Sequence, residues 1–243
     1  MKIPEILSET SLDTLIEQAA KHFEVSFQKV RIGSLYLDIL QPADMEQYIQ
    51  KLADESVGEV TLPMWIKIWP AAVLLGHYIS SLAPEPDDFQ VLELGCGTGL
   101  AGLVAASLGL RVTLTDSSPE ALLMARINIL KNRLENRAEI RLLDFRQQKL
   151  NKNFHLILGS EIFHMSNSGQ RLMKFLLNHL HPGPDSQALL AVDYRRRPEL
   201  FLKNASREFT ISEKNIGYKE QTTDHFRPEK FLCSIFRLKP RKI

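Results

Sequence analysis

An acidic residue and alternating glycines are concentrated in the run VLELGCGTGLAGL, residues 91–103. Glu93 lies two positions before Gly95, and Gly97 and Gly99 follow at every second position. Glycine allows a backbone to turn sharply and to approach a ligand closely. A helix predicted from about Gly99 to Leu108 would direct free N–H groups and a positive dipole end toward that ligand. The run therefore predicts a binding site for a nucleotide-like cofactor.

Two classes of cofactor fit this turn, and Glu93 distinguishes between them. The segment GTGLAG, residues 97–102, matches the G-x-G-x-x-G pattern of dinucleotide-binding turns. A carboxylate beside a pyrophosphate would be repelled by the like charge. S-adenosylmethionine carries a sulfonium and an ammonium group and no phosphate, so an acidic residue suits it. The residues therefore favour S-adenosylmethionine, with a nicotinamide cofactor and a purely structural turn as the alternatives.

A second acidic residue, Asp116, ends the apolar segment VTLTD. It follows the glycine turn by about twenty residues, the separation at which an acidic side chain accepts hydrogen bonds from the ribose hydroxyls of a cofactor. The alternative is that Asp116 caps a helix beginning near Pro119. The ribose contact would fit either cofactor, so Asp116 predicts a nucleoside without identifying it.

Apolar segments alternate with helical patterns from Phe89 onward, which predicts the elements that position these side chains. The predicted strands are Phe89–Leu94, Arg111–Thr115, Ala138–Leu143, Phe154–Gly159 and Ala188–Val192, and helices are predicted to begin near Leu100, Pro119, Gly169 and Pro198. Uninterrupted apolar strands are typical of a parallel sheet covered on both faces. The segments FTISEKNIG and FLCSIFRLKP predict two further strands at an antiparallel edge. Together they predict a doubly wound, Rossmann-like α/β fold.

The first sixty residues predict elements outside this alternation. Ser11 can cap a helix extending to about Phe23, and alternating apolar residues between Val30 and Ile39 predict a strand or hairpin. Pro42 is predicted to begin a second helix, and Pro70 an apolar helix extending to about Ser81. We therefore predict an N-terminal helix and strand extension, residues 1–60, followed by one domain, residues 61–243.

The glycine turn and the tryptophan before it resemble a known family. The pattern E-x-G-x-G-x-G, residues 93–99, resembles the first motif of the class I, seven-β-strand, S-adenosylmethionine-dependent methyltransferases. The segment WPAAVLL, which begins at Trp69, resembles methyltransferase family 16, a branch with many protein-lysine methyltransferases. The resemblance implies a mostly parallel seven-stranded sheet with an antiparallel edge strand, S-adenosylmethionine as the cofactor, and a protein lysine as the methyl acceptor.

The resemblance also implies which residues hold the cofactor. Asp144 and Phe145, which follow the third strand, would bind the adenine amino group and stack on the adenine ring; a turn in a surface loop is the alternative. Trp69 would contact the cofactor, whereas Trp65 is not a candidate. The predicted cofactor residues are Trp69, Glu93, Gly95, Cys96, Gly97, Gly99, Asp116, Ser117, Asp144, Phe145 and Ser160.

The acceptor is predicted to bind where the fourth strand ends in SEIFH, because ligands of doubly wound folds lie at the carboxyl ends of strands. Family 16 members carry a D-x-x-Y motif there, and this chain has E-x-F-H, with a histidine in place of the tyrosine. Glu161 is predicted to be catalytic and to orient the amine, with Phe163, His164 and Tyr194 contacting the substrate. The alternatives are a helix-start carboxylate or a structural ion pair for Glu161, and an ordinary surface or packing histidine for His164. Arg195–Arg197 are interpreted as a solvated charge run.

Composition argues against several classes of protein. The chain has 243 residues, a formal net charge of +1 and two cysteines. This charge balance predicts neither a nucleic-acid nor a membrane partner, and no apolar run reaches transmembrane length. The scarcity of cysteine and the absence of a recognisable leader predict a cytoplasmic protein. No metal site is predicted.

Protein-lysine methylation is the preferred function. Methylation of a small molecule is the second hypothesis, because the same fold accepts both kinds of substrate. A nicotinamide-dependent oxidoreductase is the third, and Glu93 disfavours it. A non-catalytic cofactor-binding protein is the fourth, and the intact set of Glu93, Gly95, Gly97 and Asp116 disfavours it.

Overall fold

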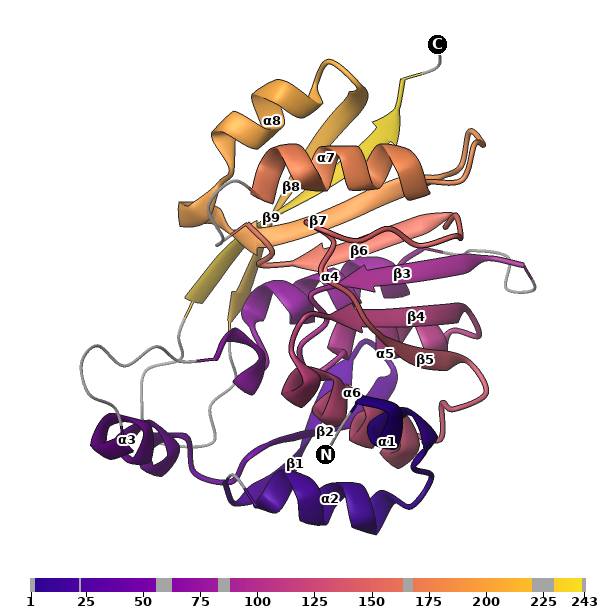
Figure 1. Ribbon diagram of the computed structural model, residues 1–243. Coiled ribbons are helices and arrows are strands. Elements are labelled where there is room, and N and C mark those ends of the chain that lie inside the picture. Colours follow the sequence, from indigo (N-terminus) through magenta and orange to yellow (C-terminus); the bar gives the residue numbers. More distant parts are fainter. Residues whose placement is uncertain are drawn as a thin grey trace.

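A seven-stranded sheet lies at the centre of the computed structural model, which describes residues 3–21, 23–55, 63–82, 88–163, 168–219 and 230–241 (Figure 1). The strands are β3 (Gln90–Leu94), β4 (Arg111–Asp116), β5 (Ala138–Leu142), β6 (Leu156–Ser160), β7 (Gln187–Asp193), β8 (Phe209–Lys219) and β9 (Lys230–Pro240). Their spatial order is β5-β4-β3-β6-β7-β9-β8. Strands β3 to β7 are mutually parallel, and β9 is antiparallel to both β7 and β8. The predicted fold is confirmed, with the antiparallel strand one position inside the edge.

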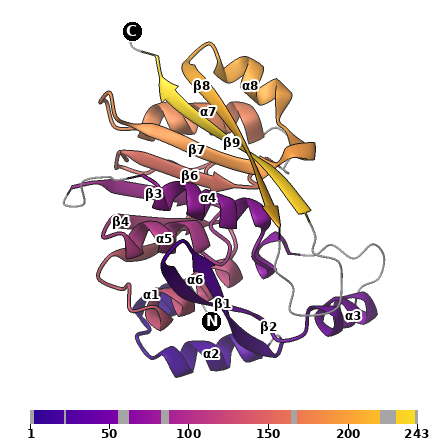
Figure 2. The same cartoon turned by 180° about the vertical axis from the view of Figure 1, so that it is seen from behind.

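Helices cover both faces of this sheet, as Figures 1 and 2 show from opposite sides. One layer contains α4 (Pro70–Ser80), α5 (Leu100–Ser107) and α6 (Pro119–Lys131), and the other contains α7 (Ser168–His179) and α8 (Glu199–Ala205). Successive side chains of a strand point to opposite faces. In β3, Val91 accordingly packs into the apolar cluster of the first layer, and Leu92 and Leu94 into that of the second. Burial on both faces explains why these strands are apolar throughout.

The direction of winding reverses between β3 and β6. From β3 the chain proceeds outward to β4 and β5, and it then crosses to β6 and β7 on the other side. The connections that leave the carboxyl ends of β3 and β6 therefore diverge, and in open α/β sheets this divergence creates the crevice where ligands bind. The glycine turn after β3 and Glu161 after β6 are thus brought to the same end of the sheet.

The N-terminal elements are α1 (Ile3–Ser8), α2 (Leu12–Ala20), β1 (Val25–Ile32), β2 (Leu35–Pro42) and α3 (Met45–Glu55). Strands β1 and β2 form an antiparallel hairpin, and α1, α2 and this hairpin gather beside α6, opposite β8 and β9 (Figures 1 and 2). Asn128 of α6 accepts a hydrogen bond from the Leu40 N–H at 2.8 Å, and its amide group donates to the Thr98 carbonyl at 2.8 Å. This buried side chain links the hairpin to the glycine turn.

Local signals predict several of these elements well. The Ser11 hydroxyl accepts a hydrogen bond from the Thr14 N–H and precedes α2, and the hairpin forms as expected. Pro70 is the first residue of α4, as the fixed φ of proline favours. Buried residues of the extension join the apolar cluster that also contains Val91, so the domain boundary near residue 60 stays a prediction. None of the described helices has the length and the apolar character needed to cross a membrane.

The prediction that Pro42 begins a helix is wrong. Pro42 is the last residue of β2 and lies opposite Val25 of β1. Helix α3 begins at Met45, and the Asp44 carboxylate caps it by accepting a hydrogen bond from the Gln47 N–H at 2.9 Å. A proline fits a strand end as readily as a helix start, and here the pairing of the hairpin decides between them.

Candidate active site

A cavity of about 370 Å³ opens at the carboxyl ends of β3, β4, β5 and β6. The segment before α4, which includes the short helix η1 (Met64–Ile66), closes one side. All of the predicted cofactor residues line this cavity except Glu93 and Gly99. Its wall also contains residues that the sequence did not single out for the cofactor, among them Trp65, Lys67, Thr98, Leu143 and Ile162. The volume lies within the range of small-molecule and cofactor sites.

The glycine turn forms the wall below β3. Gly95, Gly97 and Gly99 have φ angles of 59°, 53° and 84°, a region that residues with side chains rarely adopt. Gly102, one turn into α5, is required for a different reason. A Cβ atom there would lie 2.4 Å from the Leu114 side chain and 2.6 Å from Glu93 Oε2. The turn and this close approach set α5 directly against β4, with the helix beginning beside the cavity.

Glu93 lies beneath the turn, outside the cavity wall. Its side chain is buried, and Oε2 accepts a hydrogen bond from the Gly102 N–H at 2.8 Å. Burial raises the pKa of Glu93 to about 8, against the lowering effect of this hydrogen bond, and the Asp116 charge raises it further. At neutral pH the group is therefore largely protonated. In the structure this side chain holds the turn through the Gly102 N–H, and its attraction for a cationic cofactor stays a prediction.

Asp116 joins two backbone segments at the cavity. Oδ2 accepts a hydrogen bond from the Gly97 N–H, and Oδ1 accepts one from the Ser118 N–H, both at 3.0 Å. Asp116 also lines the cavity, which places its carboxylate within reach of a ligand. The alternative role is excluded, because Ser118 caps α6 by accepting a hydrogen bond from the Ala121 N–H at 3.2 Å.

Cys96 lines the same part of the cavity, between Gly95 and Gly97. Burial raises the pKa of its thiol well above the ordinary value, and the nearby Asp116 and Glu93 carboxyl groups add to the rise. The side chain is therefore a neutral thiol that contributes shape to the wall and no charge.

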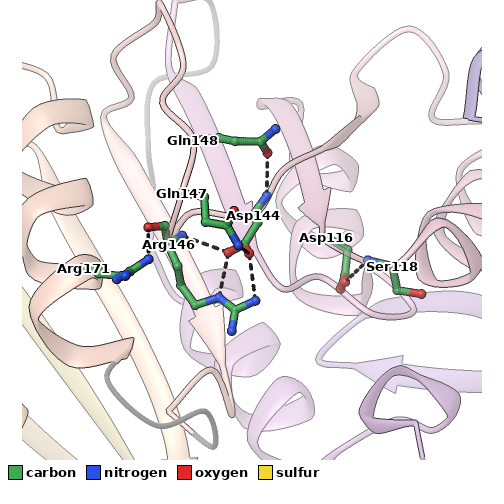
Figure 3. A network of polar contacts seen from close by, with 7 residues as sticks. All are labelled: Asp116, Ser118, Asp144, Arg146, Gln147, Gln148 and Arg171. Carbon is green, nitrogen blue, oxygen red and sulfur yellow. Dashed lines mark hydrogen bonds and ion pairs between the residues drawn. The ribbon is translucent and has the colours of Figure 1, made fainter.

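The Asp144 carboxylate is engaged by neighbours in the loop after β5 (Figure 3). Oδ1 accepts hydrogen bonds from the Arg146 N–H and Nε, and Oδ2 accepts from Arg146 Nη2 and from Gln147 Nε2, at 2.8–3.0 Å. The Arg146 side chain lowers the pKa of Asp144. These four donors use the usual acceptor capacity of a carboxylate, so binding an adenine amino group would require one donor to leave. Phe145 lines the cavity and packs edge-on against Phe175.

Two tryptophans close the cavity on the side of η1. The Trp69 indole N–H donates to the Met64 carbonyl at 2.5 Å, which fixes the ring. Lys67 Nζ lies 4.3 Å and the Arg196 guanidinium 5.7 Å from the Trp69 ring centroid. Trp65, which is not among the predicted cofactor residues, also lines the cavity, and its Cα lies 3.4 Å from where a Gly97 Cβ would be; its exclusion as a cofactor contact stays a prediction. Trp65 gave no separate sequence signal, since its place depends on how the segment before α4 folds back.

Glu161 has a φ angle of 55°, which is uncommon for a residue with a side chain. The backbone is held by a hydrogen bond from the Glu161 N–H to the Ala191 carbonyl at 2.9 Å. Oε1 accepts from the Asp193 N–H at 2.8 Å and pairs with Arg196 Nη2 at 2.9 Å. Such strain persists where surrounding contacts enforce it, often at functional sites. Glu161 lines both the cofactor cavity and a larger neighbouring groove of about 1010 Å³.

Arg196 is a further residue at this site that the sequence did not single out. It belongs to η2 (Tyr194–Arg196), directly after β7. The arginine triplet is not a uniformly solvated run, since Arg195 pairs with Asp193 at 2.8 Å, Arg196 with Glu161, and Arg197 with Glu213 at 2.8 Å. The sequence signal that could have indicated Arg196 is its position shortly after a predicted parallel strand.

The predicted substrate residues do not gather at Glu161. The Phe163 ring packs against Phe201 of α8, with centroids 4.9 Å apart, and the Tyr194 side chain is 45% exposed. Neither residue lines the cavity or the neighbouring groove. His164 lies outside the described residues. Their contacts with a substrate stay predictions.

Comparison with known proteins agrees with this geometry. A family model described as lysine methyltransferase matches residues 51–210. Protein N-lysine methyltransferase METTL21A of Mus musculus is 35% identical over 152 residues, which cover 60% of this chain and 68% of that protein. The Danio rerio protein of the same name is 33% identical, covering 65% and 73%. Among solved structures, a precorrin-6y C5,15-methyltransferase from Geobacter metallireducens superposes with a TM-score of 0.58 at 13% identity, covering 78% and 95%, which shows a shared fold.

The fold, the glycine turn and these matches define a class I methyltransferase that uses S-adenosylmethionine. The chain belongs to the lysine methyltransferase family, whose model spans more than half of its 243 residues. The cavity fits the cofactor in size, and the carboxylate residue Asp116 lies in its wall together with apolar residues that include Leu143, Phe145 and Ile162. A nucleoside has this combination of polar and apolar surface.

Proposed function

We propose that this enzyme methylates the ε-amino group of a lysine in an acceptor protein, with Glu161 orienting that amine. The observation that carries the proposal is the position of Glu161 at the junction of two spaces. It lines the cavity that fits the cofactor and also the larger groove, together with Lys67 and Trp69. A lysine side chain that enters from the groove would meet the cofactor at this junction. The METTL21A relatives, which are named protein N-lysine methyltransferases, support this acceptor.

The proposed cofactor contacts follow the walls of the cavity. Asp116 would accept hydrogen bonds from the ribose hydroxyls, and Phe145 would face the adenine. The glycine turn with Cys96, the loop residues Ser117 and Ser160, and Trp69 would form the remaining contacts. The adenine amino group would reach Asp144 by displacing Gln147, whose hydrogen bond of 3.0 Å is the neutral one at Oδ2.

The bound cofactor supplies an electrophilic methyl group, and the residues around Glu161 prepare the acceptor. A lysine ammonium has a reference pKa near 10.4, so neutralising it at pH 7 costs about 4.6 kcal/mol. A nearby sulfonium and an apolar wall reduce that cost. The Glu161 carboxylate holds the arriving ammonium and aligns the amine, and the Trp69 ring offers a face that attracts cations. Water in the groove can carry the released proton, so Glu161 is not required as a general base.

The larger groove favours a polypeptide over a small acceptor. Its volume of about 1010 Å³ is at the upper end of small-molecule sites, and it lies beside a separate cavity that is sized for the cofactor. A small molecule would leave most of this surface in contact with water. The cytoplasm is the proposed compartment, because Cys96 and Cys233 are both free and buried.

Methyl-labelled S-adenosylmethionine and a cell lysate provide the test of this function. We expect label in discrete protein bands, with mass spectrometry placing the methyl group on a lysine ε-nitrogen. The Asp116→Ala variant should give no such bands. Label confined to the small-molecule fraction would contradict a protein acceptor and favour the second hypothesis, a small-molecule methyltransferase. Protein label on a residue other than lysine would contradict the assigned acceptor group.

Asp116→Ala should weaken binding of S-adenosylmethionine by about 10- to 100-fold, because hydrogen bonds to charged groups contribute about 1.5–3 kcal/mol. Isothermal titration calorimetry measures this affinity without an acceptor. Asp185→Ala, which removes an exposed carboxylate from a turn remote from the cavity, is the matched control and should bind as the wild type does. Equal affinities for both variants would remove Asp116 from the cofactor site.

A further inference from the structure

The groove beside the cofactor cavity is lined by parts of the chain that are distant in sequence. Strand β1 provides one wall, η2 and the start of β9 provide another, and the first residues of α4 lie between them. The groove meets the cofactor cavity at Lys67, Trp69 and Glu161. A protein segment whose lysine reaches Glu161 would therefore lie along this groove, with its neighbouring residues against β1.

Hydrogen bonds fix the β1–β2 hairpin to the segment that carries Trp69. The Gln41 side chain on β2 accepts a hydrogen bond from the Ile68 N–H at 3.2 Å, and its amide donates to the Gln28 side chain on β1. On the opposite side, Asn128 of α6 and Asn132, which directly follows α6, bind the backbone of β2. The wall made by β1 is thus part of a rigid framework around the junction. The residues matched by the family model, 51–210, begin after this hairpin.

Positive charge predominates in the groove. Among the residues that the structure describes, five cationic side chains line it, Lys29, Arg31, Lys67, Arg195 and Arg196, against the two carboxylates of Asp193 and Glu161. Each carboxylate is paired with an arginine, Asp193 with Arg195 and Glu161 with Arg196.

Of the other three cations, two contact groups other than carboxylates: Lys67 Nζ lies over the Trp69 ring, and Arg31 Nε donates to the Gly33 carbonyl at 3.0 Å while its guanidinium lies 5.8 Å from the Tyr36 ring centroid. Lys29, Arg31 and Lys67 are exposed, and none forms an ion pair with a carboxylate in the part of the chain that the structure describes. Asp38 lies opposite Lys29 across the hairpin but does not line the groove. The excess is local, because the whole chain has a net charge of only +1.

We propose that this groove binds an acidic segment of the acceptor protein, next to the lysine that is methylated. The proposal rests on the proposed function and adds to it the charge of the sequence around the acceptor. Lys29 and Arg31 lie two positions apart on β1 and therefore on the same face of the strand, which they share with their cross-strand partners Asp38 and Tyr36. Together with Lys67 they would pair with carboxylates on the segment. At the junction, Glu161 and Trp69 select the one cationic residue of that segment.

An acidic polypeptide fits these features better than a nucleic acid does. Both are anionic, but the groove leads to a carboxylate and an aromatic face, which suit an ammonium group. A nucleic acid carries no such group and would bring phosphates toward Glu161. The test therefore also compares the acidic peptide with a nucleic acid.

Fluorescence anisotropy with labelled peptides tests the proposal without requiring turnover. Three peptides share one central lysine, which is flanked by glutamate and aspartate, by serine and glycine, or by arginine. The wild-type enzyme should bind the acidic peptide about tenfold more tightly than the neutral one, and added salt should remove the difference. Equal affinity for the acidic and neutral peptides, or no measurable binding of any peptide, would overturn the proposal. Tighter binding of a single-stranded oligonucleotide would also overturn it.

The double variant Lys29→Glu/Arg31→Glu tests the wall itself. It should lose the preference for the acidic peptide, whereas Lys203→Glu/Arg207→Glu, which makes the same charge change at exposed residues in and just after α8, should retain it. Circular dichroism confirms that both variants fold. Retained preference in the hairpin variant would overturn the proposal. Failure of the proposed function is seen separately, as the absence of lysine label in the lysate assay.

Discussion

Replacing Glu161 with glutamine should lower kcat for methyl transfer to protein by about 100-fold, while the affinity for S-adenosylmethionine stays within about twofold of the wild type. Glutamine keeps the shape of the side chain and can still accept the Asp193 N–H, so the strained backbone retains its support. It has no charge with which to hold and align an arriving ammonium. Initial rates of label incorporation into the lysate protein fraction measure the loss in methyl transfer, and calorimetry measures the affinity for S-adenosylmethionine.

Arg196 permits this substitution without a large loss of stability. Its side chain is 48% exposed, so water can solvate the guanidinium when the Glu161 charge is removed. The matched control is Glu199→Gln, which changes an exposed carboxylate that pairs with Arg197 away from the cavity. The control should keep the wild-type rate. A Glu161→Gln rate within about threefold of the wild type would refute an orienting role for this carboxylate.

The strands and the position of the site follow from local patterns in the sequence. Apolar runs such as those of β3 and β7 predict strands buried on both faces, and the glycine turn predicts the end of β3. The topological rule then places residues that follow strands at one edge of the sheet. Asp116, Asp144, Ser160 and Glu161 all line the cavity for this reason.

The features that sequence reasoning missed depend on contacts between distant segments. Trp65 reaches the cavity because η1 folds against the glycine turn, and Arg196 reaches Glu161 because η2 turns back across the end of β6. Asp144 follows its strand as predicted, yet Arg146 and Gln147 occupy its carboxylate. The Asp144 partners lie only two and three residues away, whereas the contacts of Trp65 and Arg196 join distant segments and leave no mark in the spacing along the chain.

Glu93 illustrates the same limit within the motif itself. Its position before the glycines predicted a carboxylate facing a cationic cofactor, but the side chain turns beneath the loop to the Gly102 N–H. The short contact between Glu93 Oε2 and the hypothetical Cβ of Gly102 shows why both positions are coupled. The acidic residue holds the turn in place, and its burial has a consequence for stability that can be measured.

Glu93 should make the enzyme less stable as the pH rises toward 8. Burial raises the pKa of Glu93 from 4.5 to about 8, so the folded state keeps a proton that the unfolded state loses. The contribution of Glu93 to the free energy of unfolding is fully present below about pH 4.5 and is lost as the pH rises through about 8. Relative to Glu93→Gln, the wild-type free energy of unfolding should fall by about 1.4 kcal/mol per pH unit in that window, or about 5 kcal/mol across it. Urea unfolding of both proteins at several pH values measures this difference.

Comparison with the variant isolates this residue, because the other titrating groups are common to both proteins. Glutamine can still accept the Gly102 N–H and cannot ionise, so Glu93→Gln should be the more stable protein at pH 8. Glu139→Gln on β5, which is separated from β3 by β4, is the matched control; its carboxylate is exposed and accepts a hydrogen bond from Thr113 Oγ1 at 2.9 Å. If the free energy of unfolding changed with pH in the same way for the wild type and for Glu93→Gln, Glu93 would be ionised in the folded state. The sequence-based expectation of a charged Glu93 carboxylate near the cofactor would then be restored.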